Sequence, residues 1–202
     1  GKKRTGKRVL TVGTDCSVGK MYTSLALEAA MRERGMKADF RATGQTGILV
    51  AGEGIAIDAV IADFIAGAAE ALSPANDADH WDIVEGQGSL FHPSYAGVSM
   101  GLIHGAQPHW LVMCHEMGRP HMRHLPHQPM VSLKDCVEAN LRAAHVTSDH
   151  VQLAGFAINT SNYSEEEARA YCAEITAQFG VPATDPVRFG IADIAALLQE
   201  RG

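Results

Sequence analysis

The sequence predicts an α/β fold, a three-layer sandwich in which helices cover both faces of a mainly parallel sheet. Three features support this prediction. Short apolar runs alternate with segments of helical periodicity along the chain. Several runs end in a glycine or a polar residue, as buried parallel strands do at the edge where sites form. A phosphate-loop motif lies between the first apolar run and the first helix, which indicates a P-loop NTPase-like architecture.

Each element is predicted from a local pattern. Short apolar runs predict strands at 8–13, 37–42, 81–85, 110–114, 151–158 and 181–184. The first helix, 20–34, stops before Gly35, a residue that suits a helix C-terminus. Helices are also expected at 55–72, where apolar residues recur at helical spacing, and at 164–179, where Ser164 begins a capping box. The remaining helices are predicted at 95–104, 133–144 and 191–201, and the glycine-rich stretch 43–54 shows no regular element.

The charge pattern restricts the possible partners. The net charge is −6, yet five of the 17 basic residues lie together at the start of the chain, namely Lys2, Lys3, Arg4, Lys7 and Arg8. We interpret residues 1–7 as a solvated basic linker and residues 8–202 as one P-loop α/β domain. Because that domain is acidic, the sequence argues against nucleic-acid binding, although a short basic arm is the alternative interpretation.

Cysteine usage and hydropathy indicate a cytoplasmic protein. The four cysteines are scattered and form no CxxC pair, which favours reduced thiols over a disulfide framework or a structural zinc site. No apolar run approaches the ~18 residues of a membrane span, so no membrane partner is expected. The chain does not begin with Met and leads directly into a strand. We therefore expect it to be the C-terminal domain of a longer protein, with an N-terminal domain missing.

Residues 13–20 (GTDCSVGK) form the phosphate-binding motif. In such loops, N–H groups at a helix N-terminus surround a phosphate and the lysine adds a point charge. Gly13 lies one residue further from Gly19 than the strict motif requires, but the order of strand, loop and helix is right. We expect cofactor phosphate to be bound by Gly13, Thr14, Asp15, Cys16, Ser17, Val18, Gly19 and Lys20.

Met21 occupies the position at which P-loop enzymes place a Ser or Thr hydroxyl on Mg²⁺. A thioether is a poor ligand for this hard cation, and Thr23 and Ser24 lie further along the helix. Binding of ATP with Mg²⁺ is therefore possible but disfavoured. Cys16 has two interpretations, a nucleophile whose thiol pKa is lowered by the loop and a small residue that fits a tight turn, and we favour the second.

Polar residues also follow other strands of the predicted sheet. Glu85 ends an apolar strand before Gly-Gln-Gly, where a carboxylate can act as a base or hold metal-bound water. Asn159 ends a later strand and either binds a purine ring or amide of the cofactor, or caps the following helix. Gln45 and Thr46 follow the second strand and are candidates for binding a small substrate.

The segment 114–127 (CHEMGRPHMRHLPH) is rich in histidine and arginine. One interpretation is a metal cluster of His121, His124 and His127, or a histidine base beside anion-binding arginines. Two prolines interrupt any helix that would align these histidines, and no Asp or Cys near them completes a ligand set. We therefore predict no metal, and favour a loop over an anionic ligand in which Arg119 binds a carboxylate or phosphate.

These motifs together resemble the DgcN family, which includes D-glutamate N-acetyltransferases. The resemblance is carried in order by TVGTDCSVGKM, ATGQTGILVAGEG with IDAVIADFIAGA, VEGQGSLFHP, CHEMGR, and GFAINTSN with TDPVRFG. It covers essentially the whole chain, and family members carry an additional N-terminal domain. The P-loop and the VEGQG strand are also similar, more distantly, to dethiobiotin synthetase and its ATP-dependent relatives.

The resemblance implies transfer of an acetyl group from acetyl-CoA to the amino group of D-glutamate. Such a reaction needs a base for the ammonium proton, donors for the thioester oxygen and cations for the substrate carboxylates. We assign Glu85 or His115 as the base and Arg119 as the group that binds a carboxylate. The partner would be a small-molecule amino acid, and we expect a homo-oligomer. The alternatives are an ATP/Mg-dependent ligase or kinase acting on a small carboxylate, and a non-catalytic nucleotide-binding domain.

Overall fold

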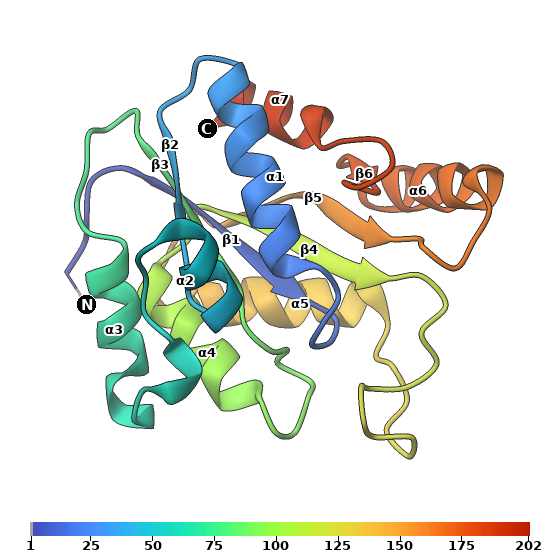
Figure 1. Cartoon of the computed structure of the whole chain (residues 1–202), viewed down its shortest axis with the longest axis horizontal. Helices are drawn as coiled ribbons and strands as arrows, with labels where there is room; N and C mark the ends of the chain where they lie inside the picture. The colour runs from blue at the N-terminus through green and yellow to red at the C-terminus, as the bar shows by residue number, and fades with distance from the viewer. Residues whose placement is uncertain (1) are drawn as a thin grey trace.

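The computed structural model describes residues 2–202 and confirms the three-layer α/β architecture (Figure 1). Within these residues six parallel strands form one sheet in the order β2-β3-β1-β4-β5-β6. Their bounds are β1 (Lys7–Gly13), β2 (Ala38–Arg41), β3 (Trp81–Val84), β4 (Trp110–Glu116), β5 (Gln152–Asn159) and β6 (Ala183–Thr184). Because β1 pairs with both β3 and β4, the loops that follow these three strands emerge side by side.

Helices pack on both faces of the sheet because successive residues of the buried strands point to opposite sides. On one face, Val9 belongs to a cluster with residues of α1 (Lys20–Glu33) and α7 (Ala192–Arg201). On the other, Leu10 and Val12 pack in a cluster that includes residues of α3 (Ile65–Leu72), α4 (Ala96–Ala106), α5 (Leu133–Ala144) and α6 (Glu165–Phe179). The predicted capping box of α6 is present at Ser164.

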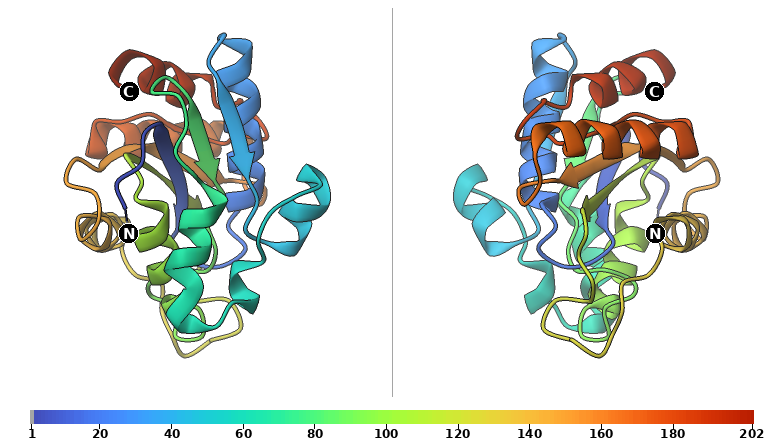
Figure 2. Two further views of the ribbon diagram at one scale, coloured as in Figure 1. Left: turned by 90° about the vertical axis from the view of Figure 1, so that its left-hand side faces the viewer. Right: turned by 90° about the vertical axis from the view of Figure 1, so that its right-hand side faces the viewer.

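Two predictions about local structure are wrong. The stretch 43–54 contains a short helix, α2 (Gln45–Ala51), which stands away from the sandwich in Figure 2. The stretch 55–72 is not one helix but two 3-10 turns, η1 (Ile57–Ala59) and η2 (Ala62–Phe64), followed by α3. The backbone is extended at Val60 and Ile61, both β-branched residues that tolerate this conformation well. The helical periodicity misled because Ile57 and Ile65 still reach the core across the break.

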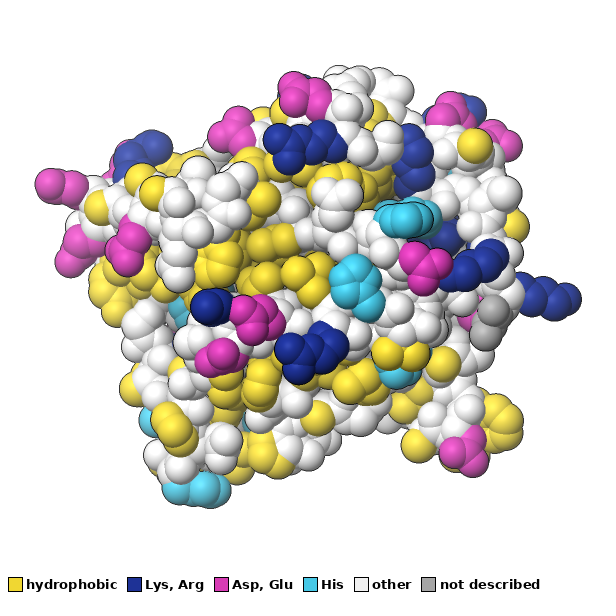
Figure 3. All heavy atoms as spheres, turned by 180° about the vertical axis from the view of Figure 1, so that it is seen from behind, with side chains coloured by type: hydrophobic (Ala, Val, Ile, Leu, Met, Phe, Trp, Pro, Cys, Tyr) yellow, Lys and Arg dark blue, Asp and Glu magenta, His cyan; other side chains and the backbone are white. Residues whose placement is uncertain are grey.

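The basic N-terminal segment is also not uniformly solvated, contrary to our interpretation. The Arg4 guanidinium donates hydrogen bonds to the carbonyl oxygens of Glu70 (2.8 Å) and Gly105 (2.6 Å), at the C-terminal ends of α3 and α4. Arg8 is 3% exposed and donates to the Gln107 carbonyl. Figure 3 shows basic and acidic side chains interspersed over one face of the molecule. No helix within residues 2–202 has the length and apolar character needed to cross a membrane.

Candidate active site

The P-loop joins the end of β1 to the start of α1 at the carboxyl edge of the sheet. Gly13 must be glycine, since a Cβ there would lie 2.8 Å from both the Asp15 carbonyl and Lys20 Nζ. Ser17 and Gly19 have left-handed backbone angles, with φ of 53° and 98°. Gly19 is the N-cap of α1 and offers no side chain, so the first-turn N–H groups remain available to an anion.

Lys20 places its ammonium inside this loop. The residue is 7% exposed, and Nζ donates to the Asp15 carbonyl at 2.8 Å. Burial lowers the pKa of Lys20, and the neighbouring Cys114, Cys16 and Asp15 only partly oppose that shift. A buried cation beside unpaired N–H donors gains stability when an anion arrives. The buried Lys20 ammonium and the N–H groups at the start of α1 therefore lie on one loop, and its binding of phosphate stays a prediction.

The hydroxyl groups that follow the P-loop are directed away from it. Thr23 and Ser24 are buried, and Ser24 Oγ donates to the Lys20 carbonyl at 3.0 Å. Thr23 Oγ1 lies 3.6 Å from the Cys114 thiol. Neither residue replaces the hydroxyl that Met21 lacks, and the loop does not fit the usual P-loop magnesium site.

The thiol of Cys16 is not activated. Burial, followed by the charge of Asp15, raises its pKa, and the opposing effect of Lys20 is smaller. The interpretation of Cys16 as a low-pKa nucleophile is therefore wrong, and its role as a small residue in a tight turn is the one that remains.

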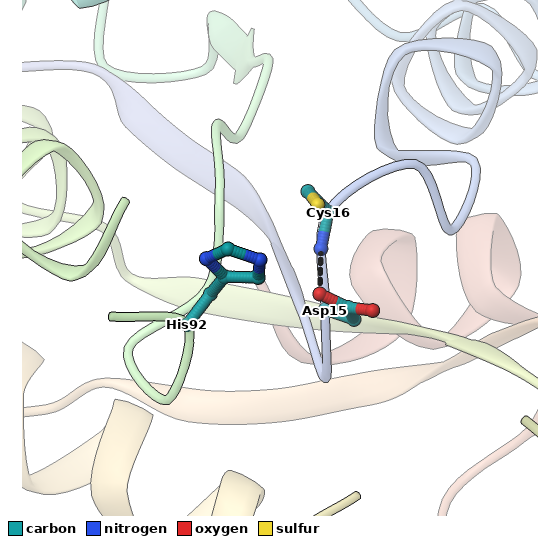
Figure 4. Close-up of side chains that lie close together, drawn as sticks. All are labelled: Asp15, Cys16 and His92. Atoms are coloured by element: carbon teal, nitrogen blue, oxygen red, sulfur yellow. Dashed lines mark hydrogen bonds between the residues drawn. The ribbon is translucent and has the colours of Figure 1, made fainter. Parts of the chain in front are cut away.

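Asp15, Cys16 and His92 approach one another as metal ligands do (Figure 4). The ligand atoms of Asp15 and His92 are nevertheless already bonded within the protein. His92 Nε2 pairs with the Arg123 carbonyl at 3.0 Å, and its Nδ1 accepts from Ser94 N at 3.3 Å. Asp15 Oδ1 accepts from Cys16 N at 2.7 Å. Binding a metal here would break these bonds, so the group is better described as a hydrogen-bonded anchor of the P-loop.

Glu85 organises the opposite side of the site. Its Oε2 accepts from the N–H groups of Thr43 (2.8 Å) and Gly44 (3.0 Å), which fixes the loop before α2. A Cβ on Gly47 would lie 2.3 Å from the same oxygen, so the glycines of this stretch make room for the carboxylate. Gln87 completes the arrangement by donating to Thr43 Oγ1 at 3.0 Å. Within residues 2–202 no donor bonds to Glu85 Oε1.

Several cavities adjoin the P-loop in the described part of the chain, and two of them contain predicted site residues at its two sides. We call the first, of about 540 Å³, the open cleft; its lining includes Lys20, Gln45, Thr46, Asp58 and Glu85. The second, of about 190 Å³, we call the β5 pocket; its lining includes Val18, Asn159, Asp185, Val187 and Arg188. Gly19 and Tyr22 line both cavities. The open cleft thus contains Gln45, Thr46 and Glu85, but not Arg119, the third predicted substrate residue. Asn159 lies on the other side of the loop.

The remaining predicted residues lie elsewhere. His115 is buried and pairs through Nδ1 with Thr14 Oγ1 at 3.0 Å, and burial, reinforced by Arg119, lowers its pKa to about 4. Asn159 does not cap α6, which Ser164 caps; its Oδ1 accepts from Ser161 N at 3.0 Å. The ring nitrogens of His121, His124 and His127 form no ligand group in the described part of the chain.

Sequence reasoning missed several residues that line the two cavities. Asp58 stands in η1, and neither its type nor its spacing marks it in the sequence. Asp185 and Arg188 follow β6, where the Asp185 carboxylate accepts from Thr160 N at 3.0 Å and Val187 N at 2.9 Å. The sequence signal for Asp185 was the Asp-Pro pair, which is typical of a fixed turn.

Comparisons with known proteins agree with this geometry. The model of the DUF1611 family, described as a domain of unknown function (DUF1611_C) P-loop domain, matches residues 1–195. A curated relative from Pseudoalteromonas, named D-glutamate N-acetyltransferase, is 57% identical over 198 residues. That match covers 98% of this chain and 60% of the relative, so the chain spans only part of the relative's length.

Solved structures show the same fold. A DUF1611 family protein from Anabaena variabilis superposes with a TM-score of 0.89 at 39% identity, covering 96% of this chain and 57% of that protein. Cobyrinic acid a,c-diamide synthase from Mycobacterium smegmatis, with bound ADP and magnesium, gives a TM-score of 0.54 at 14% identity. The second match covers 96% of this chain and 92% of that protein and supports the P-loop fold alone.

Proposed function

The chain belongs to the DUF1611 family, and we propose that it is the P-loop domain of a D-glutamate N-acetyltransferase that uses acetyl-CoA. The observation that carries this proposal is a phosphate-binding loop with a buried lysine and free N–H groups, but with Met21 in place of the magnesium hydroxyl. Such a loop suits a phosphate that is held without being transferred. The name of the Pseudoalteromonas relative supplies the reaction.

The two cavities suit the two ends of CoA. The adenosine part would occupy the β5 pocket, where Val18 and Val187 offer apolar surface and Asn159 offers an amide. The pyrophosphate would lie on the P-loop against Lys20, and the pantetheine arm would extend into the open cleft. Gly19 and Tyr22 border both cavities, which gives the cofactor a continuous path between them.

The acceptor amine would meet the thioester in the open cleft. Its nitrogen attacks the thioester carbon, the C–N bond forms, the C–S bond breaks, and CoA leaves as the thiol after taking up a proton. A base must remove a proton from the ammonium nucleophile. We assign this role to Glu85, which lines the open cleft and whose Oε1 accepts no bond from the described residues, rather than to His115, which lines neither cavity.

The test is a mass-spectrometric assay of the full-length protein with D-glutamate, first with acetyl-CoA and then with Mg–ATP. The proposal expects N-acetyl-D-glutamate with acetyl-CoA alone. ADP or AMP appearing without any acetylated product would overturn it. Glu85→Gln is expected to lower kcat by roughly 10²-fold or more, the usual contribution of a general base.

The second candidate is an ATP-dependent ligase or kinase acting on a small carboxylate. It is favoured by the fold shared with the M. smegmatis synthase that binds ADP and magnesium. Met21, together with the inward-facing Thr23 and Ser24, argues against it in this chain. The Mg–ATP arm of the same assay separates the two candidates.

A further inference from the structure

We propose that Arg119 is a positioning residue that holds the P-loop in its phosphate-binding shape, and that it does not bind the substrate carboxylate. Arg119 follows β4, on a segment that packs against the loop from outside the open cleft, and it is absent from the lining of both cavities. The inference rests on the proposed function only for the identity of the anion as CoA. The geometry of the loop itself is independent of that identity.

The guanidinium of Arg119 is occupied by protein acceptors. Nη1 donates to Asp15 Oδ2 at 2.7 Å and to the Cys16 carbonyl at 2.9 Å. Nη2 donates to the Ser17 carbonyl at 3.3 Å and to the Glu116 carboxylate. Four of its five N–H donors are thereby used, and little capacity remains for a substrate carboxylate.

These contacts determine where the loop's N–H groups point. The carbonyls of Asp15, Cys16 and Ser17 are each bonded to a cation, the first to Lys20 and the other two to Arg119. In a trans peptide, the carbonyl of one residue and the N–H of the next point in opposite directions. Holding the Cys16 and Ser17 carbonyls therefore directs the N–H groups of Ser17 and Val18 away from Arg119. Within residues 2–202 neither N–H has an acceptor.

Asp15 bonds the P-loop to the segment after β4 that contains Arg119 and Arg123. It is fully buried, and its Oδ2 accepts from both the Arg119 side chain and Arg123 N, each at 2.7 Å. Burial alone would raise the pKa of Asp15, but the hydrogen bonds from Arg119, Arg123 and Cys16 lower it overall. The Arg123 carbonyl is in turn bonded to buried His92, which anchors the segment to the rest of the domain. The loop is thus held through charge-assisted bonds on the side away from the anion.

The experiment compares wild-type protein with Arg119→Ala and Arg119→Lys. Affinities for inorganic pyrophosphate and CoA are measured by calorimetry, and the order of the Ser17 and Val18 amides by ¹⁵N relaxation without ligand. We expect Arg119→Ala to lower both affinities and to raise the KM for acetyl-CoA by roughly ten- to a hundredfold, because misplaced donors bind poorly. We expect the KM for D-glutamate not to change, and the amide order to fall.

Arg119→Lys separates positioning from folding. Its ammonium keeps a charge for buried Asp15 but cannot reach both carbonyls, so the variant should fold and recover only part of the affinity. Arg123→Ala is the matched control, because it removes an exposed guanidinium from the same segment and leaves its bonded N–H in place. It should bind pyrophosphate like wild type.

The outcomes distinguish this inference from the proposed function. Unchanged amide order and CoA affinity in folded Arg119→Ala, with a raised KM for D-glutamate, would overturn the inference and return Arg119 to substrate binding. Reduced amide order and pyrophosphate affinity in that variant, while wild type fails to bind CoA, would support the inference and reject CoA as the anion.

Discussion

The P-loop and the α2 segment (Gln45–Ala51) form opposite sides of the open cleft, yet the protein holds them very differently. The P-loop is fixed by buried charges, with Lys20, Asp15 and Arg119 bonded to it or within it. The α2 segment is tied at its N-terminal end to Glu85, and its Leu49 and Val50 side chains are 83% and 59% exposed. The P-loop side of the cleft is therefore rigid, whereas the α2 side is attached by few contacts.

This difference fits the two tasks of the proposed reaction. A phosphate-binding loop binds its anion more tightly when the N–H donors are already oriented before the anion arrives. The side that receives an amino acid and releases its product benefits from a segment that can move at little cost in free energy. Glu85 connects the P-loop side and the α2 side. It accepts a hydrogen bond from the loop before α2, and it lines the open cleft together with Lys20.

The largest expected effect comes from a substitution that forces apart the ends of β1 and β3, the strands that lead to the P-loop and to Glu85. Gly86 follows Glu85, and a Cβ there would lie 1.7 Å from the Thr11 carbonyl of β1. Because that neighbour is backbone, Gly86→Ala should destabilise the fold by about 3 kcal/mol or more. Urea denaturation followed by circular dichroism measures this loss. A variant as stable as wild type would show that β1 and β3 can separate locally, against the rigid description of the P-loop side.

The pH dependence of stability tests the buried contact between the P-loop and β4. Because the pKa of His115 falls from 6.5 to about 4 on folding, the unfolded chain binds a proton in this range that the folded protein does not. Its contribution to stability is complete above pH 6.5 and is lost as the pH falls towards 4. Wild type should lose about 3 kcal/mol more than His115→Gln between pH 7 and pH 4.

Urea denaturation of both proteins at the two pH values measures this difference. Parallel losses in the two proteins would show that His115 is accessible to protons in the folded state. His115 would then return as a candidate base beside Glu85.

On the α2 side, Gly47→Ala should disturb both chemistry and stability. The added Cβ would lie 2.3 Å from Glu85 Oε2, so this carboxylate must shift and weaken its bonds to Thr43 and Gly44. We expect kcat to fall roughly tenfold as Glu85 is displaced, and the free energy of unfolding to fall by about 1–3 kcal/mol as the two N–H groups lose their acceptor. Gly67→Ala is the control, since that helical glycine has open space around it and should gain up to about 1 kcal/mol. Full activity of Gly47→Ala would remove Glu85 from the reaction.

The smallest effect is expected at the exposed surface of α2. Leu49→Gln should leave the free energy of unfolding within about 0.5 kcal/mol of wild type, because the side chain is already in solvent. Thermal denaturation at several protein concentrations makes the measurement. A large, concentration-dependent loss would show that α2 is covered by another chain in solution, and would end the description of this side as lightly held.

The sequence predicted the structure of the P-loop side, whereas on the α2 side it indicated the polar residues Gln45, Thr46 and Glu85 but not the helix. Residues 13–20 identify the P-loop because its donors and its lysine are adjacent in the chain. The α2 helix could not be predicted from its own glycine-rich residues, since it depends on Glu85, forty residues later, to bond Thr43 and Gly44. The position of Arg119 was equally hidden. Its residue type indicated anion binding, but only the fold shows that Asp15 and two P-loop carbonyls occupy it.

The proposed function requires that the P-loop hold a phosphate of CoA without magnesium. Calorimetric titration of acetyl-CoA into wild type and Lys20→Ala, both in EDTA, tests it most directly, with Lys134→Ala as a control for loss of an exposed lysine. We expect binding to wild type and to the control, and at least about tenfold weaker binding to Lys20→Ala, since the buried ammonium makes charge-assisted contacts. Equal affinity in all three proteins, or binding that appears only when magnesium is added, would contradict it.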